Sequence, residues 1–147
     1  MRKVRRSALV QHSASDMFSL VEDIESYPGF LPWCKSAVIH SRDDNVVEAT
    51  LELRRGELSK HFRTRNSATG KESIEMTLVD GPFRHLAGRW SFKQLGEAGS
   101  KVELDLDFEF SSSVVDVLFG PFFEETCNSL VDAFTKRADE VFGSDRS

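Results

Sequence analysis

The stretch KVELDLDFEF, residues 101–110, decides the fold class of this chain. Every second residue in it is apolar, and the residues between them are charged. The apolar positions are Val102, Leu104, Leu106, Phe108 and Phe110. Strict alternation with a period of two is typical of a β-strand with one buried and one wet face. The stretch therefore predicts an antiparallel sheet that is covered on one side.

Similar alternation occurs earlier in the chain, at residues 46–53, 61–65, 73–78 and 85–93. Short runs rich in Asp, Asn, Gly and Pro separate these segments and predict tight turns. Residues 3–10 alternate loosely and predict a first strand. Ser13 then supplies the cap of a helix that ends at Tyr27-Pro28-Gly29. The predicted order is a strand, a helix and a run of about six further strands.

The pattern changes to a helical period after residue 120. One apolar stripe contains Phe123, Cys127, Leu130, Val131, Phe134, Ala138 and Val141. It predicts a long C-terminal helix, with Gly120-Pro121 breaking or bending its first turns. A curved sheet and an amphipathic helix bury both apolar faces when the helix lies across the sheet. The sequence therefore predicts an α+β helix-grip architecture.

Length and composition limit the class of protein further. A chain of 147 residues fits a single domain, predicted over residues 1–143, with a polar tail at 144–147. The net charge of −5 argues against DNA as a partner. Cys34 and Cys127 lie far apart, which excludes a disulfide scaffold and suits a reducing compartment. We expect a cytoplasmic protein, with any membrane contact peripheral and on the cytoplasmic face of the inner membrane.

The sequence carries no recognisable motif for catalysis. The chain has no GxSxG, HExxH or phosphate-binding glycine loop, and its four histidines are dispersed. Thr64 is the one polar residue that alternation places on the inner side of the sheet. The sequence predicts that the protein is not an enzyme, with no catalytic residue, no metal site and no catalytic cofactor.

Two surface segments have more than one interpretation. The segment RRGELSKHFRTR, residues 54–65, is strongly basic. It predicts contact with anionic lipid headgroups or with ribosomal RNA phosphates, or else an ordinary charged strand. The residues concerned are Arg54, Arg55, Lys60, Arg63 and Arg65.

The second segment, residues 114–123, is very apolar and is interrupted by Gly120-Pro121. It predicts either the inner end of the gripping helix or a lid that opens against a membrane. Leu118 and Phe119 are the residues that a lid would present to the membrane.

Many of the residues on the inner side of the sheet are large and aromatic. Alternation alone does not tell whether they fill the core or line an internal cavity. Five segments of the sequence resemble those of a known family and favour a cavity. They are SYPGFLPWC at 26–34, FRTRN at 62–66, LVDGPF at 78–83, the spaced Leu86, Gly88, Trp90 and Phe92, and the end of the chain around Ala133-Phe134 and Arg137-Ala138. Together they resemble the coenzyme Q-binding START-domain family, within the polyketide cyclase/dehydrase-like superfamily, which includes RatA-like ribosome association toxins. The resemblance covers residues 4–142.

The resemblance implies a hydrophobic tunnel that binds ubiquinone or a related polyprenyl lipid. It also implies a quinone carrier or chaperone that supports respiration. Trp33-Cys34 has the form of the quinone-binding members and favours this function. The alternative is a RatA-like toxin that binds the large ribosomal subunit and blocks subunit association. Spacing and resemblance together predict a tunnel lined by Trp33, Leu51, Phe62, Met76, Leu78, Trp90, Leu104, Phe108, Cys127, Leu130 and Phe134.

Overall fold

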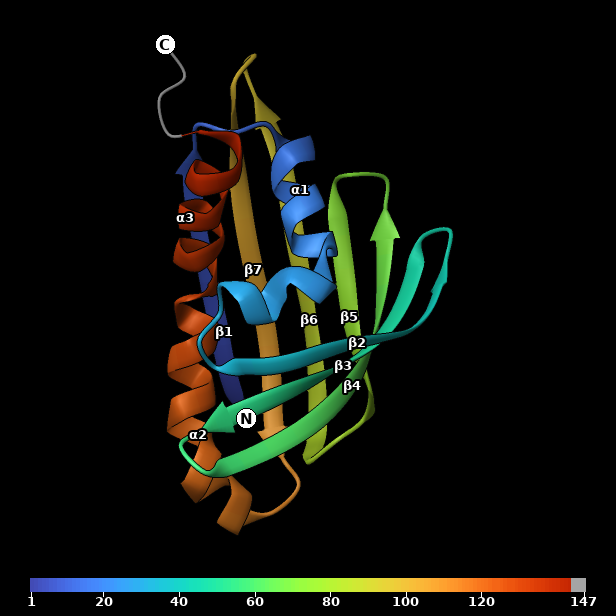
Figure 1. Cartoon of the computed structure of the whole chain (residues 1–147), viewed down its shortest axis with the longest axis vertical. Helices are drawn as coiled ribbons and strands as arrows, with labels where there is room; N and C mark the ends of the chain where they lie inside the picture. The colour runs from blue at the N-terminus through green and yellow to red at the C-terminus, as the bar shows by residue number, and fades with distance from the viewer. Residues whose placement is uncertain (144–147) are drawn as a thin grey trace.

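A computed structural model describes residues 1–143, and the predicted polar tail at 144–147 lies outside the described residues. The chain begins with strand β1, continues through two short helices and six more strands, and ends with two helices (Figure 1). The elements are β1 (Arg2–Val10), α1 (Ala14–Glu22), the 3-10 helix η1 (Ile24–Gly29), β2 (Cys34–Asp43), β3 (Val46–Arg55), β4 (Leu58–Thr69), β5 (Ser73–Asp80), β6 (Phe83–Leu95), β7 (Gly99–Phe110), α2 (Ser113–Asn128) and α3 (Leu130–Phe142).

All seven strands belong to one antiparallel sheet with the order β1-β7-β6-β5-β4-β3-β2. Strands that follow one another from β2 to β7 are neighbours, as hairpin connections require. β1 closes the other edge by pairing with β7, from Arg2 opposite Phe108 to Val10 opposite Ser100. The predicted antiparallel α+β sheet with one covered face is confirmed.

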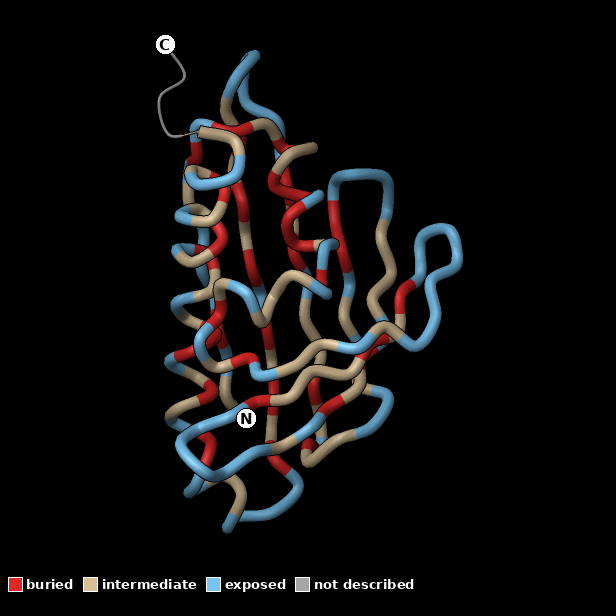
Figure 2. Tube along the Cα trace, in the orientation of Figure 1, coloured by how far each residue is buried: buried red, intermediate tan, exposed pale blue. Residues whose placement is uncertain are grey.

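The sheet is strongly curved, and the helices lie on its concave side. β2 and β3 run across the molecule, whereas β1, β6 and β7 run along it, so the sheet folds over the helices (Figure 1). α2 and α3 follow one another along β1 and β7, and α1 packs against α3 and β6. Buried residues recur along β6, β7 and the helices that lie beside them (Figure 2).

The C-terminal helix is interrupted at a different place from the one the sequence predicted. α2 continues through Pro121, and the break lies at Ser129, between α2 and α3. The Ser129 hydroxyl donates to the Thr126 carbonyl oxygen at 2.8 Å, and its N–H also bonds to carbonyls of the last turn of α2. Pro121 is tolerated inside α2 because its turn lies at the surface, where Val117 is 74% exposed and its carbonyl can meet water.

Two groups of aromatic rings fill the two ends of the core, and no ring contact joins one group to the other among the described residues. The Phe123 cluster contains Phe62, Phe83, Phe108, Phe110 and Phe123. The Phe134 cluster contains Phe18, Tyr27, Phe30, Trp90, Phe92 and Phe134. Large inward residues therefore fill both ends of the core and leave its middle to smaller side chains.

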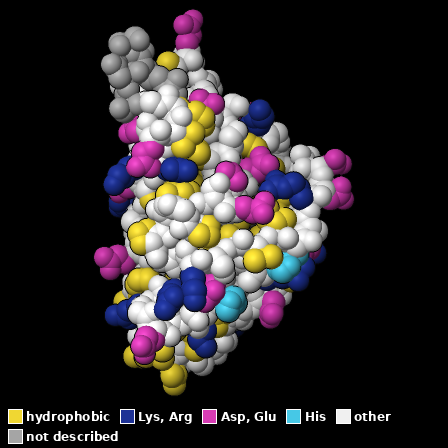
Figure 3. All heavy atoms as spheres, in the orientation of Figure 1, with side chains coloured by type: hydrophobic (Ala, Val, Ile, Leu, Met, Phe, Trp, Pro, Cys, Tyr) yellow, Lys and Arg dark blue, Asp and Glu magenta, His cyan; other side chains and the backbone are white. Residues whose placement is uncertain are grey.

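The outer surface is charged and mixed in sign. Acidic and basic side chains are interspersed over the face seen in Figure 3, in agreement with the modest net charge of −5. No helix among residues 1–143 is long and apolar enough to cross a bilayer.

Candidate functional site

An open cleft enters the molecule between the helices α1 and η1 and the turns of two hairpins. Its volume is about 360 Å³, within the range of roughly 300–1,000 Å³ typical of small-molecule sites. The rim of the cleft is polar, because its lining includes Glu22, Asp44 and Lys71. Phe18, Val21 and Ile74 supply apolar surface deeper in.

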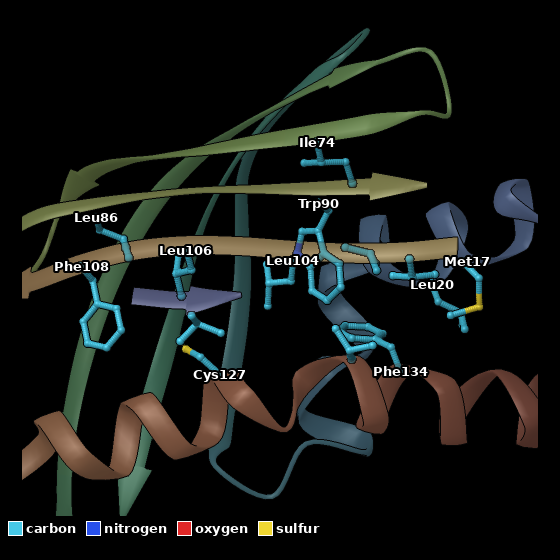
Figure 4. Packing of buried hydrophobic residues seen from close by; sticks show 14 of the residues in the cluster. Met17, Leu20, Ile74, Leu86, Trp90, Leu104, Leu106, Phe108, Cys127 and Phe134 are labelled. Atoms are coloured by element: carbon cyan, nitrogen blue, oxygen red, sulfur yellow. The ribbon is translucent and has the colours of Figure 1, made fainter. Parts of the chain in front are cut away.

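A smaller cavity of about 80 Å³ lies beneath the cleft, between the sheet and the helices α2 and α3. It occupies the gap between the two aromatic clusters: Phe62 and Phe123 belong to one end, and Trp90 and Phe134 to the other. Figure 4 shows Trp90 on β6 and Phe134 on α3 pointing toward one another, with Cys127 on α2 pointing at the sheet. The space between sheet and helices is therefore partly filled and partly open.

Five residues line both the cleft and the inner cavity, so the two spaces meet. They are Ile24, Tyr27, Asn66, Met76 and Trp90. Asn66 is the most polar of them. Its Oδ1 accepts a hydrogen bond from the Thr64 hydroxyl at 3.1 Å, and its amide nitrogen has no partner among the described residues. A hydrogen-bond donor is therefore available where the polar cleft passes into the apolar cavity.

A glycine on β6, Gly88, lies against two residues of the cavity wall. A Cβ at Gly88 would lie 2.7 Å from both the Leu106 Cδ1 and the Met76 Cε, and 3.2 Å from the Asp105 carbonyl oxygen. Leu106 and Met76 both line the cavity. A glycine within a strand often marks such a close approach.

Nine of the predicted tunnel residues line the inner cavity, namely Trp33, Leu51, Phe62, Met76, Trp90, Leu104, Cys127, Leu130 and Phe134. Leu78 and Phe108 do not. Phe108 is completely buried and lies behind Phe123, with ring centroids 4.8 Å apart. Leu78 is on the inward side of β5 but lies near the end of the strand, beyond the cavity. That these residues contact a ligand stays a prediction.

Several lining residues had escaped the pattern analysis. They are Ile24, Tyr27, Ala49, Asn66, Leu86, Leu106, Phe123 and Thr126. Leu86, Leu106 and Phe123 were on the predicted inner stripes, and periodicity did not distinguish them from filled core. Ile24 and Tyr27 belong to a proline-containing 3-10 helix, which has no simple amphipathic period.

The inner cavity wall carries no carboxylate, imidazole, ammonium or guanidinium group among the described residues. Its two weakly acidic groups are kept neutral. Burial raises the pKa of the Tyr27 phenol well above its usual value, and its hydroxyl donates to the Val21 carbonyl oxygen. Burial likewise raises the pKa of the Cys127 thiol, with the nearby Glu124 carboxylate adding to the effect. The wall suits an uncharged, apolar ligand better than acid–base chemistry.

The predicted basic segment divides into two parts in the structure. Arg63 and Arg65 lie on the outer face of β4 and share one carboxylate, Glu48, at 2.9 Å and 2.7 Å. These two arginines lower the pKa of Glu48, with Arg65 the larger cause. Arg54 and Arg55 are exposed at the β3–β4 turn, without a carboxylate partner among the described residues. Lys60 is half-buried near the same turn.

The structure also separates the two residues that were predicted to form a lid. Phe119 is 1% exposed and packs in the core, so it is not available for membrane contact. Leu118, one position earlier on α2, is 42% exposed. The prediction is wrong for Phe119 because α2 turns that side chain toward the sheet.

The fold and the apolar cavity define a START-like class of protein, and comparison with known proteins agrees. A family model described as polyketide cyclase/dehydrase and lipid transport matches residues 10–135, and the chain belongs to this family. The START superfamily protein from Mycobacterium smegmatis has 25% sequence identity and a TM-score of 0.80, covering 95% of this chain and 98% of that chain.

The relatives by sequence carry two kinds of name. The ribosome association toxin RatA of Vibrio cholerae is 46% identical over 143 residues, 97% of this chain and 99% of that protein. The mitochondrial coenzyme Q-binding protein COQ10 of Dictyostelium discoideum is 30% identical over 142 residues, 94% of this chain and 69% of that protein. The higher identity to RatA outweighs the Trp33-Cys34 pair, which had favoured the quinone-binding members.

Neither of these relatives is named as an enzyme, but the fold also occurs in enzymes. The Zhui aromatase/cyclase from a Streptomyces species has a TM-score of 0.85 at 14% identity and covers 97% of this chain and 96% of that chain. At this identity the likeness concerns the fold alone.

The two buried cysteines provide a test of the description of the interior as buried and apolar. Burial raises the pKa of Cys34 to about 11, with the Glu52 charge adding to it, and raises that of Cys127 further. A raised pKa leaves less thiolate at pH 8 than in a free cysteine, and only the thiolate is nucleophilic. We expect iodoacetamide to label both thiols far more slowly in the native protein than in urea. Labelling of either cysteine at the rate of a free thiol, assigned with Cys34→Ser and Cys127→Ser, would contradict the description.

Proposed function

We propose that this chain is a RatA-type protein that binds the large ribosomal subunit and opposes subunit association in the cytoplasm. The observation that carries the proposal is the 46% identity to the V. cholerae protein along nearly the full length of both chains. Such a function needs a surface for RNA phosphates on a protein that is acidic overall, with a net charge of −5. A local cluster of basic side chains must therefore supply the contact.

The β3–β4 turn is the best candidate for that contact. Arg54 and Arg55 are exposed there, and Lys60 lies nearby. Arg63 and Arg65 are weaker candidates because Glu48 already neutralises part of their charge. Reversing their charge would also place new carboxylates beside Glu48, so a loss of binding would be hard to separate from a damaged sheet.

Binding to purified large subunits, measured by co-sedimentation over a range of salt concentrations, tests this proposal. We expect the double variant Arg54→Gln/Arg55→Gln to bind more weakly. Its slope of log affinity against log salt should be smaller by about two, since each lost phosphate contact removes about one.

Arg89→Gln is the matched control, because this exposed arginine on β6 has its nearest carboxylate, Glu75, 3.9 Å away. Equal binding by the turn variant and the control would contradict the assignment of the turn. Absence of binding by the unmodified chain would contradict the function itself.

A second function, binding of a polyprenyl quinone or a similar lipid, is favoured by a separate observation. An apolar cavity, lined by no charged group of residues 1–143, continues into a cleft large enough for a small molecule. The family includes lipid transport proteins, and the relative COQ10 is named as coenzyme Q-binding. A prenyl chain gains affinity by apolar burial, at roughly 25 cal/mol per Å² before the costs of binding.

In this proposal the ligand enters through the cleft, and the two spaces accommodate different parts of it. The inner cavity, at about 80 Å³, holds only a few atoms as it stands. Met76 lines both spaces, and its flexible side chain can move to enlarge the passage. The amide nitrogen of Asn66 would donate a hydrogen bond to a carbonyl of the headgroup.

Both tryptophans of the chain, Trp33 and Trp90, line the inner cavity, so their fluorescence reports directly on its occupancy. We expect decyl-ubiquinone to quench this fluorescence saturably. The variant Asn66→Leu should bind decyl-ubiquinone about 2- to 13-fold more weakly, because it loses the net free energy of one hydrogen bond.

Decylbenzene is the matched control ligand, because it carries a similar chain on a ring without carbonyls. Its binding is measured from the shift that it causes in the melting temperature of the protein. Asn66→Leu should leave its binding unchanged or stronger. Equal losses for both ligands would mean that Asn66 shapes the cavity and does not bind the headgroup. Linear quenching without saturation would contradict quinone binding.

A further inference from the structure

Helix α2 has apolar residues on two opposite sides. Its inner side carries Phe119 and Phe123, both buried. Its outer side carries Val114, Val117 and Leu118, which are 66%, 74% and 42% exposed. The spacing of these three places them on one stripe of the helix. A helix that is apolar all round normally has partners on both sides, and here the sheet covers only the inner one.

The β3–β4 turn lies directly beside this stripe. The Arg55 Nη1 donates to the Leu118 carbonyl oxygen at 2.9 Å, and the Arg55 guanidinium lies over the Phe122 ring, 5.6 Å from its centroid. Leu58, the first residue of β4 after this turn, is 46% exposed and adds to the apolar surface. Hydrophobic side chains and Lys or Arg side chains are close together at the end of the molecule where α2 begins (Figures 1 and 3).

Two carboxylates near the stripe, Asp116 and Glu124, are engaged by one arginine. Arg2 binds Asp116 through Nε and Nη2, at 3.0 Å and 3.1 Å, and binds Glu124 through Nη1 at 3.1 Å. Gly120 makes this possible, because a Cβ there would lie 2.6 Å from the Arg2 Nη2. The surface therefore combines exposed aliphatic side chains with basic groups, whereas two of its neighbouring acidic groups are neutralised.

We propose that the outer stripe of α2 and the β3–β4 turn form a docking surface for an anionic lipid membrane. Val114, Val117 and Leu118 would enter the boundary between headgroups and acyl chains, as the apolar face of an interfacial helix does. Arg54 and Arg55 would meet the lipid phosphates. The aliphatic stripe of α2 suits RNA less well than the arginines of the turn do, since exposed valines and leucines gain nothing beside phosphates and offer no ring for base stacking.

Membrane docking on this side would bring α2 to the lipid, and α2 also forms part of the cavity wall through Phe123 and Cys127. The docking surface shares no residue with the cavity, so it does not depend on quinone binding. It shares Arg54 and Arg55 with the proposed ribosome contact, but its main contribution comes from Val114, Val117 and Leu118, which that contact does not use.

Co-sedimentation of the whole chain with vesicles tests the inference, using phosphatidylcholine alone and phosphatidylcholine mixed with phosphatidylglycerol. We expect binding to the mixed vesicles that weakens with salt. Val117→Ser should reduce the partition coefficient about tenfold, the value of burying one valine side chain. Arg55→Gln should reduce binding to the mixed vesicles about fivefold.

Val141→Ser is the matched control, because Val141 is a 48% exposed valine on the helix α3. If Val117→Ser lowers the melting temperature of the protein, Val114→Ser tests the same stripe in its place. Failure of the unmodified chain to bind either vesicle would overturn the inference, as would equal effects of Val117→Ser and Val141→Ser. A dimer that Val117→Ser dissociates would also overturn it, since a second copy would then cover the stripe.

Discussion

The packing of two aromatic side chains from the C-terminal helices onto the curved sheet determines the rest of this structure. Phe123 of α2 packs on Phe108, with centroids 4.8 Å apart, and Phe134 of α3 packs on Trp90 at 5.4 Å. Aromatic pairs of this kind contribute beyond the area that they bury. Because the two contacts lie at opposite ends of the core, they hold the helices across the sheet and leave the middle incompletely filled.

The distribution of charge follows from the same arrangement. The concave side of the sheet and the inner faces of the helices leave an inner cavity whose wall has no charged group among the described residues. Charged groups lie on the outer face of the sheet, as with Arg63, Arg65 and Glu48, or at the rim of the cleft. Isolated charges are costly to bury, so a cavity of this kind selects uncharged ligands. Contacts with an anionic partner must be made elsewhere, and the exposed arginines of the β3–β4 turn are the most available.

Sequence patterns predicted the fold well because the sheet has one wet face. The alternation at residues 101–110 appears in the structure as β7, with every apolar residue of that stretch buried. The same patterns identified much of the cavity wall but not its limits. Phe108 and Phe123 have equally apolar positions, yet one lies behind the other and only Phe123 lines the cavity. The volume left between side chains depends on how the helices sit on the sheet, and periodicity carries no information about it.

The remaining differences have local physical causes. Gly120-Pro121 was expected to break or bend the helix. The helix does not break there, because its surface tolerates the proline, and the break occurs at Ser129, where a side-chain hydroxyl can satisfy a free carbonyl. Asn66 was not predicted as a site residue because a single polar residue in a strand gives no pattern. Its importance comes from its place where two spaces meet.

The most direct test of the account is whether the space between the two aromatic clusters takes up an apolar molecule. Native mass spectrometry of the protein, purified from its source without detergent, measures this without assuming which ligand is bound. The account predicts a species heavier than the bare chain by one small molecule, which organic solvent extracts as an uncharged lipid with a carbonyl-bearing headgroup. A spectrum that contains only the mass of the chain, with no gain in mass after incubation with decyl-ubiquinone, would contradict it.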